Sequence, residues 1–415
     1  MRYVHAADLH LDSPLRGLER HEGAPVEEIR GATRRAFDNL IDLCLTQEAS
    51  FLLLSGDLYD GDWKDYSTGL FMTKRLAQLR EAGTRVFLIR GNHDAASRIT
   101  KQLELPDNCT ELATRAPETV IDEDLGVAVH GQGYAQRAVT VDLAADYPDA
   151  LTDLHNIGLL HTALDGREGH DPYAPTSVEL LGSKGYDYWA LGHVHQREVL
   201  ATDPWIVFPG NPQGRHAREL GAKGASLVEV DDGRVVSVEH QVLDVVRWER
   251  VEVDVTDFLD LDEILEHLRH QLERATTEAG GRLLAARVVL NGRCEAHAEL
   301  GRDPEVLEAA ARALAAELDG SCWIEKIQLN TLPPLSLEEL TARHDLLGQV
   351  LDRLQHLRDD DEALLALGDC LGPLAKKLPL EARRGDDGFD PKDPAWLRTV
   401  LDSVQRRVLP HLLDR

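Results

Sequence analysis

The chain has 415 residues, of which 43% are hydrophobic and 28% are charged, a composition typical of globular proteins with two or three domains that need no disulfide staple. Its formal net charge of -28 argues against a protein that holds nucleic acid by a basic surface of its own. No segment has the length of a signal peptide's apolar region or of a membrane span, so we expect a cytoplasmic protein with no membrane partner. The cysteines are scattered and form no Cys-x-x-Cys pair, which predicts core thiols rather than disulfides or a zinc site. They are Cys44, Cys109, Cys294, Cys322 and Cys370.

Through about residue 245, apolar runs alternate with amphipathic stretches, a pattern typical of an α/β domain. Helices are expected over Glu28–Glu48 and Asp65–Ala82, where apolar residues recur at helical spacing. The later runs follow one another without helices, so the predicted sheet arrangement is mixed. The expected strands are Tyr3–Ala7, Phe51–Leu54, Arg85–Ile89, Val127–His130, Ile157–His161, Tyr188–Leu191, Ile206–Phe208, Ala225–Val230 and Val235–Val242.

Beyond Arg247 the pattern predicts a second, smaller α/β unit and then a helical region. Pro333-Pro334 ends the small unit, because consecutive prolines continue neither a helix nor a central strand. Pro373, Pro379 and residues 384–388 interrupt the helical pattern, and a last helix starts at Pro394. The small unit's expected elements are Glu249–Val255, Leu261–Thr277, Leu284–Asn291, Pro304–Leu318 and Trp323–Leu329. We therefore expect domains over residues 1–245, 246–332 and 333–415.

The apolar run Phe51–Leu54 ends abruptly at Gly56-Asp57. Such a run predicts a strand buried on both faces, and ligands in open α/β sheets lie at the carboxyl ends of such strands. One carboxylate can place an oxygen on each of two cations about 3.5–4 Å apart. Asp57 is therefore our candidate for a bridging metal ligand, although a lone Gly-Asp pair is more often a loop aspartate that caps a helix.

Five short motifs follow five of the expected strands. Asp, His and Asn together supply oxygen and imidazole ligands, which suit Mn, Fe or Zn better than an all-oxygen Mg site. In Asp-x-His and His-x-His, residues two apart project to the same side of an extended chain, so both can reach one site. The motifs are Asp8-Leu9-His10, Gly56-Asp57, Gly91-Asn92-His93-Asp94, Leu160-His161 and Gly192-His193-Val194-His195. Their order predicts a metal site, whereas His5 and His130 match no such motif and are expected to be structural.

This ordered set resembles that of the calcineurin-like metallophosphoesterases. Within them the chain is similar to the DNA repair exonuclease group of SbcD and the Mre-type nucleases, and most closely to the YhaO-type proteins. The motifs cover residues 1–245, and the similarity extends to the following domain by architecture only. The resemblance implies an α/β sandwich of two mixed sheets flanked by helices, followed by a small α/β cap domain and a helical C-terminal tail.

The resemblance also implies a set of metal ligands and catalytic residues. Two divalent metal ions are expected, with Mn²⁺ as the ion of choice. His93 would contact the scissile phosphate and protonate the leaving oxygen, and Asp94 would orient His93 unless it is a simple turn residue. The first metal would be held by Asp8, His10, Asp57 and His195, and the second by Asp57, Asn92, His161 and His193.

Two further positions are candidate substrate-binding residues. Archaeal and eukaryotic members of the group carry a histidine where this chain has Asp60, and a carboxylate cannot donate to a phosphate unless it is protonated. The loop Phe208–His216 resembles the family's loop after the last ligand strand, and its Arg215, followed by Arg218 and Lys223, could meet a nucleic-acid backbone. Solvated charges in a turn are the alternative for this loop.

The resemblance implies a metal-dependent DNA nuclease, an exonuclease or endonuclease that hydrolyses phosphodiester bonds in DNA repair or end processing. It also implies a homodimer whose helical tail binds an SbcC-like coiled-coil ATPase of the YhaN type. If that partner supplies the basic DNA-binding surface, the net charge of -28 is accounted for. Two alternatives stay open, namely a phosphodiesterase on small nucleotide substrates and a non-catalytic scaffold that binds DNA ends.

Overall fold

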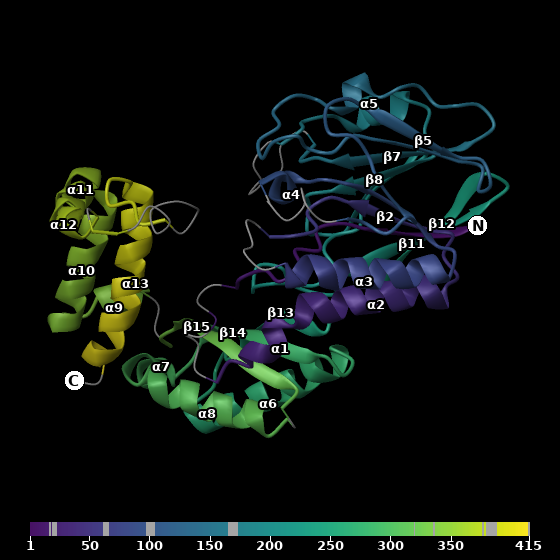
Figure 1. The fold of residues 1–415 in the computed structure, drawn as a ribbon. Coiled ribbons are helices and arrows are strands. Elements are labelled where there is room, and N and C mark those ends of the chain that lie inside the picture. Colours follow the sequence, from purple (N-terminus) through teal and green to yellow (C-terminus); the bar gives the residue numbers. More distant parts are fainter. Residues whose placement is uncertain are drawn as a thin grey trace. The chain divides into compact units, whose positions relative to one another are not determined.

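The computed structural model describes residues 1–15, 18, 23–60, 66–96, 104–164, 173–318, 320–334, 337–375, 377–378 and 388–413. The chain divides into two compact units, shown in Figure 1. The first comprises Met1–Glu249 and Thr276–Ala286, and the second comprises Arg250–Ala275 and Arg287–Arg415. Pro379 and residues 384–387, where the sequence predicts a break in the helical tail, lie outside the described residues.

The first unit contains two six-stranded mixed sheets, which confirms the predicted sandwich. One sheet has the strand order β12-β11-β1-β2-β3-β4 and the other has the order β5-β6-β7-β8-β10-β9. The strands of the first sheet are β1 (Arg2–Ala6), β2 (Phe51–Ser55), β3 (Arg85–Ile89), β4 (Cys109–Glu111), β11 (Gly224–Asp231) and β12 (Arg234–Val242). Those of the second are β5 (Glu118–Asp122), β6 (Val127–Gly131), β7 (His155–His161), β8 (Tyr188–Gly192), β9 (Glu198–Thr202) and β10 (Trp205–Phe208).

Parallel strands in this unit bring several strand ends to common edges. β1, β2 and β3 are parallel neighbours in one sheet, and β6, β7 and β8 are parallel neighbours in the other. Helices α2 (Ala32–Thr46) and α3 (Ser67–Glu81) connect the first three strands and lie along the outer face of their sheet (Figure 1). The strands of each parallel set therefore end on the same side, which is where the metal-ligand motifs occur.

Apolar side chains fill the space between the two sheets. The ring of Tyr3 stacks on that of Phe51 at 4.5 Å between centroids, and both pack with Val129 and Ile157 of the second sheet. A separate apolar layer joins the first sheet to α2 and α3 through residues such as Phe37. Because β2 is buried along its whole length, the loop that follows it is held at a fixed position.

The structure differs from the predicted elements where the apolar pattern is weak or broken. Gly31 divides the expected helix Glu28–Glu48 into α1 (Val26–Arg30) and α2. Strands β4, β5 and β9 were not predicted, because they are short or half-exposed and lack a continuous apolar run. Four short helices were also missed, α4 (Asn92–Ala96), α5 (Val178–Ser183), α7 (His297–Arg302) and the 3-10 helix η2 (Ala144–Asp146).

The second unit contains most of a three-stranded parallel sheet in the order β13-β14-β15. This sheet matches the small α/β unit predicted from the sequence. Its strands are β13 (Val246–Asp254), β14 (Leu283–Arg293) and β15 (Cys322–Leu332), and its helices are α6 (Leu261–Glu278), α7 (His297–Arg302) and α8 (Pro304–Ala316). The helical region that follows contains α9 (Leu337–Thr341), α10 (Leu346–Asp359), α11 (Asp361–Cys370), α12 (Gly372–Ala375) and α13 (Pro394–Leu413). Leu340, Leu347 and Leu351 form a small core in it.

All five cysteines are free, as predicted, but one of them lies outside the cores. Cys44, Cys294 and Cys322 are buried and Cys109 is half-buried, whereas Cys370 is exposed at the end of α11, so the prediction of a core thiol was wrong there. Among the described helices, none is both long and apolar enough to cross a membrane.

Candidate metal centre

The ends of five strands converge at one edge of the sandwich, and the predicted ligands lie there. Asp8 and His10 follow β1, Asp57 follows β2, and Asn92 begins α4 just after β3. From the second sheet, His161 is the last residue of β7, while His193 and His195 follow β8. The structure thus brings together all seven of the residues predicted to hold metal.

The loops after β1 and β2 continue side by side beyond the strands. The amides of Asp8, His10 and Leu11 donate to the carbonyls of Gly56, Asp57 and Leu58, each at 3.0 Å. A bridge between Leu11 and Tyr59 extends the pairing. These bonds fix the backbone on either side of the carboxylates of Asp8 and Asp57.

Close backbone approach explains two of the glycines in the motifs. A side chain at Gly192 would collide with the carbonyl oxygen of Ser55, and one at Gly91 would collide with the carboxylate of Asp57. Gly192 therefore lets the two sheets approach each other, and Gly91 lets the loops after β2 and β3 of one sheet approach each other.

Four of the candidate ligands have a backbone conformation that L-residues rarely adopt. The φ angles are 54° at Asp8, 43° at His10, 52° at Asp57 and 101° at His193. Each such residue costs of the order of 1–3 kcal/mol and persists only where the surrounding structure enforces it. Strain of this kind, observed at adjoining strand ends, is typical of a functional site.

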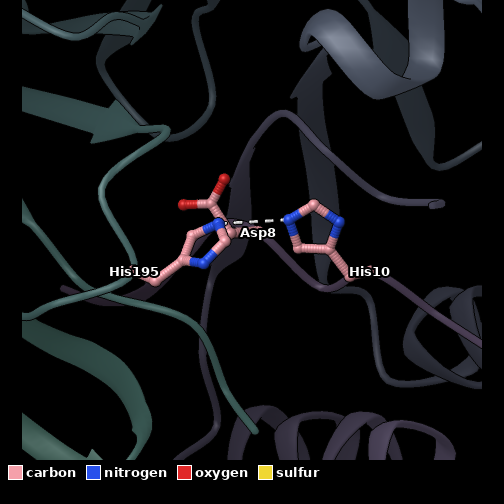
Figure 2. Close-up of side chains that lie close together, drawn as sticks. All are labelled: Asp8, His10 and His195. Atoms are coloured by element: carbon pink, nitrogen blue, oxygen red, sulfur yellow. Dashed lines mark hydrogen bonds between the residues drawn. The ribbon is translucent and has the colours of Figure 1, made fainter. Parts of the chain in front are cut away.

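A first cluster consists of Asp8, His10 and His195, shown in Figure 2. One ligand atom of each lies within 4.8 Å of the others. The Nε2 atoms of His10 and His195 approach to 3.2 Å, and the Asp8 carboxylate accepts the amide of His193 at 3.0 and 3.1 Å. Two imidazole nitrogens that face each other beside a carboxylate form a set of donors suitable for a cation.

A second cluster consists of Asp57, His161 and His193, again with ligand atoms within 4.8 Å of one another. The Asp57 Oδ2 atom lies 3.5 Å from His161 Nε2 and 3.8 Å from His10 Nε2. Asp57 therefore lies between the two clusters, as a bridging ligand must. The Asn92 Oδ1 atom, 3.0 Å from His161 Nε2, adds a neutral oxygen to the second cluster.

The outer ring nitrogens of two histidines are held by acceptors. His161 Nδ1 lies 2.8 Å from the Ser55 carbonyl oxygen, so Nδ1 carries the proton and donates to it. His195 Nδ1 lies 2.6 Å from the carboxylate of Glu219. Such contacts fix the tautomer that presents Nε2 to a metal, and they increase the basicity of the ligand.

Burial and charge shift the pKa values of these groups strongly. Burial by itself would raise the pKa of Asp57, but the adjacent His161 outweighs it and holds that pKa well below its usual range. Burial would likewise lower the pKa of His161, but the charge of Asp57 raises it to about 9. Burial raises the pKa of Asp8. Ionisable groups this deeply buried need a compensating charge, and a divalent cation supplies one.

His93 lies at the mouth of the site, with 30% of its side chain exposed. Its Nδ1 atom is 2.9 Å from Asp60 Oδ1, and ligand atoms of His10, Asp60 and His93 form a third group within 4.8 Å. Burial opposes protonation of His93, but the hydrogen bond with Asp60 outweighs it and raises the pKa of the ring. A substrate can therefore reach this histidine from solvent.

Asp94 lies in α4, and backbone amides contact its carboxylate. Its carboxylate accepts the amides of Leu58, Tyr59 and Gly91 at 2.9 to 3.1 Å, and so joins the loop after β2 to the loop after β3. Burial raises the pKa of Asp94 to about 7. These bonds favour a loop-organising function for Asp94, and the 2.9 Å contact favours Asp60 as the residue that orients His93.

Arg215 connects the two sides of the site. Its guanidinium lies 3.4 Å from Asp60 Oδ2 and 3.0 Å from Glu219 Oε1. Asp60 also accepts the hydroxyl of Ser13 at 2.6 Å. Asp60 and Arg215 thus contact each other and neighbouring side chains of the site. Their contact with a substrate stays a prediction.

Glu219 is the main residue that the sequence analysis missed. It is buried, and besides His195 it accepts the Asn211 side chain at 3.0 Å and the Arg215 amide at 2.7 Å. The hydrogen bond with His195 and the guanidinium of Arg215 hold the pKa of Glu219 far below its usual range against the opposing effect of burial. The Asn211–Glu219 loop has no periodicity, so no pattern in the sequence indicates that this glutamate faces the site.

Lys223 was expected to face a nucleic-acid backbone, and that expectation was wrong. It is buried, and its ammonium donates to the carbonyl oxygen of His195 at 3.0 Å. Arg218 is exposed. The two histidines expected to be structural are so, since His5 lies between Tyr188 and Ser55, and His130 between Thr119 and Asn156.

Comparison with known families gives two matches along the chain. The model of the calcineurin-like phosphoesterases matches residues 1–197. The model of the middle domain of metallophosphoesterase YhaO matches residues 248–332. The first match contains all seven candidate ligands, and clusters of His and Asp of this kind are those with which two-metal phosphoesterases bind metal.

Individual relatives extend the similarity over most of the chain. An uncharacterized metallophosphoesterase YhaO of Bacillus subtilis is 36% identical over 296 residues, which is 70% of this chain and 72% of the relative. The DNA double-strand break repair protein Mre11 of Methanopyrus kandleri is 27% identical over 274 residues, 58% of this chain and 56% of the relative. The SbcD subunit of the nuclease SbcCD of Escherichia coli K12 is 22% identical over 423 aligned positions, 86% of this chain and 96% of the relative.

Proposed function

This chain belongs to the calcineurin-like metallophosphoesterases, and from that premise we propose that it is a two-metal nuclease that hydrolyses phosphodiester bonds in DNA. The observation that carries the proposal is the pair of His and Asp clusters with Asp57 between them. The similarity to an SbcCD nuclease subunit and to an Mre11 break-repair protein supports DNA as the substrate.

The residues present fit two divalent cations. Asp8, His10 and His195 would hold one, His161, His193 and Asn92 would hold the other, and Asp57 would serve both. The mixture of imidazole and carboxylate donors supports Mn²⁺ as the first ion to test. When bound, two such cations supply a nucleophilic water at neutral pH and neutralise charge on the phosphoryl oxygens.

His93 is proposed as the catalytic residue that contacts the scissile phosphate and donates a proton to the leaving oxygen. It is a half-buried imidazole beside the two clusters, with its ring centroid 4.9 Å from that of His10. Asp60 holds Nδ1, so the Nε2 edge of the ring is the one available to substrate. Arg215 and Glu219 are positioning residues, since they act on Asp60 and His195.

We propose the predicted division into residues 1–245, 246–332 and 333–415, with the last two parts as cap and partner-binding region. The name of the Escherichia coli relative describes one subunit of a complex, which supports a partner for this chain. Several large apolar side chains of the helical region are exposed, namely Leu365, Leu367, Leu374 and Val404. Such side chains support docking on an SbcC-like coiled-coil ATPase, with a homodimer as the expected assembly.

The test is digestion of end-labelled duplex and single-stranded DNA by the purified chain with Mn²⁺, with His93→Ala in parallel. Cleavage by the wild type and a strong loss in the variant would support the nuclease proposal. Hydrolysis of a small phosphodiester such as bis-p-nitrophenyl phosphate without DNA cleavage, even with the partner ATPase added, would favour a small nucleotide substrate. No hydrolysis of either substrate by metal-loaded protein would favour the scaffold alternative.

A further inference from the structure

A cavity of about 730 Å³ lies in the second unit, and the proposed nuclease function makes no use of it. It is bordered by α7 and the start of α8, by Ser403 of α13, and by β15. Its volume is within the range of binding pockets that occupy roughly 300–1,000 Å³. Polar and apolar side chains both line it, so it is not a simple apolar gap between helices.

Six successive residues of β15, Lys326–Thr331, line this cavity. Successive side chains of a strand point to opposite faces of the sheet, so a cavity on one face would be lined mainly by every second residue. Burial follows this alternation in part, because Lys326 and Asn330 are exposed whereas Thr331 is buried. The cavity therefore runs along the edge of the strand, beside its backbone.

That edge carries no further strand in the described part of the chain. β15 is the last strand in the order β13-β14-β15, and no other described strand pairs with it. Its amides and carbonyls on this side form the kind of template to which an extended peptide adds as a further strand. Six residues of strand are about 20 Å long, enough to pair with a short peptide.

A buried imidazole also borders the cavity. His297 is 4% exposed, and its Nδ1 atom lies 2.9 Å from the hydroxyl of Thr331. Among the described residues, its Nε2 atom has no hydrogen-bond partner. A buried ring nitrogen without a partner is unfavourable, so an occupant that bonds to it is stabilised in this position.

The charged side chains at this edge favour an acidic occupant. Lys326 lines the cavity, and the carboxylate Glu308, which also lines it, lies 3.1 Å from the guanidinium of Arg312. Lysine on an edge strand normally hinders pairing with another strand. Opposite a carboxylate it becomes a cross-strand ion pair instead, so the same lysine rejects basic strands and accepts acidic ones.

We propose that the edge of β15 binds an extended acidic segment of a partner polypeptide, which adds as a fourth strand to the sheet β13-β14-β15. The occupant's backbone pairs with Lys326–Thr331. Its acidic side chains face Lys326, and one of its polar groups bonds to His297. This interaction does not use the residues of the metal centre.

The probe is a fluorescein-labelled hexapeptide of alternating valine and glutamate, titrated with the full chain and followed by fluorescence anisotropy. We expect saturable binding, and no binding of the matching valine–lysine peptide. Lys326→Glu should weaken binding about tenfold or more, because a like charge then faces the glutamates. Lys392→Glu, at an exposed lysine outside the cavity, is the matched control and should bind like the wild type.

Two N-methylated versions of the peptide test the backbone pairing directly. Methyl groups on the amides of one side of the strand should weaken binding about tenfold or more, since two or three hydrogen bonds are lost, while the same groups on the other side should be tolerated. Absence of saturable binding would overturn the proposal. Equal affinities for both methylated peptides, or for wild type and Lys326→Glu, would also overturn it, and unchanged thermal melting of each variant shows that it is folded.

Discussion

Two fully buried histidines, His5 and His161, both contact Ser55 but differ in their other partners and in their pKa values. His5 contacts the Ser55 hydroxyl at 3.0 Å and the Tyr188 hydroxyl at 2.9 Å, so both of its nitrogens have neutral partners. His161 contacts the Ser55 carbonyl at 2.8 Å and turns its other nitrogen toward Asn92 and Asp57. Burial lowers the pKa of His5 to about 3, whereas the charge of Asp57 overcomes burial and raises that of His161 to about 9.

The difference shows that burial alone does not identify a functional histidine. The interior accepts His5 because every polar atom of the ring is satisfied, and the ring stays neutral. Around His161, by contrast, carboxylates and imidazoles face one another on strained backbone, and only a shared cation or proton makes that arrangement favourable. A ligand site is therefore recognised by ionisable side chains whose polar atoms face one another, and a structural histidine by ring nitrogens that each have a neutral hydrogen-bond partner.

Asp57→Asn should have the largest effect, because it removes the charge shared by the two clusters. We expect metal content after dialysis to fall below that of the wild type, and hydrolysis to fall to the background rate. Elemental analysis and turnover of bis-p-nitrophenyl phosphate measure the two quantities. Asp124→Asn, at an aspartate that is 85% exposed, is the control. Full metal content in Asp57→Asn would contradict the bridging assignment.

His93→Ala should reduce the rate of hydrolysis without changing the binding of metal. We expect unchanged metal content and a turnover lower by roughly 10²–10⁴-fold, the usual contribution of a general acid. The same two assays apply, with His356→Ala at an exposed histidine as the matched control. Loss of metal from His93→Ala would instead make this residue a ligand.

Glu219→Gln should weaken metal binding by about 10–100-fold, because the carboxylate no longer supports the ring of His195. Titration calorimetry with Mn²⁺ measures the affinity. Glu229→Gln changes a glutamate that is 45% exposed and pairs with Arg2 on the surface, and it should bind like the wild type. Equal affinities for both variants would show that the 2.6 Å contact does not support the ligand.

His5→Gln should have the smallest effect, and only on stability. The folded pKa of about 3 lies below the ordinary value of 6.5, so the unfolded chain takes up the proton first as pH falls. The stability that neutral His5 contributes is therefore present above pH 6.5 and is lost between pH 6.5 and 3, by up to about 1.4 kcal/mol per pH unit. Urea unfolding at pH 7.5, 6 and 5 should show the gap between wild type and variant narrowing. A constant gap would mean that His5 does not titrate on unfolding.

The sequence predicted those parts of the site that depend on strand ends. Asp8, Asp57, His161 and His193 each follow a continuous apolar run, and parallel strands in a sandwich bring such ends together. The contacts of Glu219 and the pairing of Asp60 with His93 were not predicted, because they join loops whose geometry is set only when both sheets are packed. β5 and β9 were missed for a related reason, since half-exposed strands carry a weak alternation.

The paired loops after β1 and β2 have a consequence for the kinetics of metal exchange. Backbone bonds from Asp8, His10 and Leu11 order this segment through main-chain atoms alone, independently of any ion. The backbone entropy of Asp8, His10 and Asp57 is then lost during folding and not again when a cation binds. Association should therefore be limited by dehydration of the ion, and one metal should replace another without local unfolding of the chain.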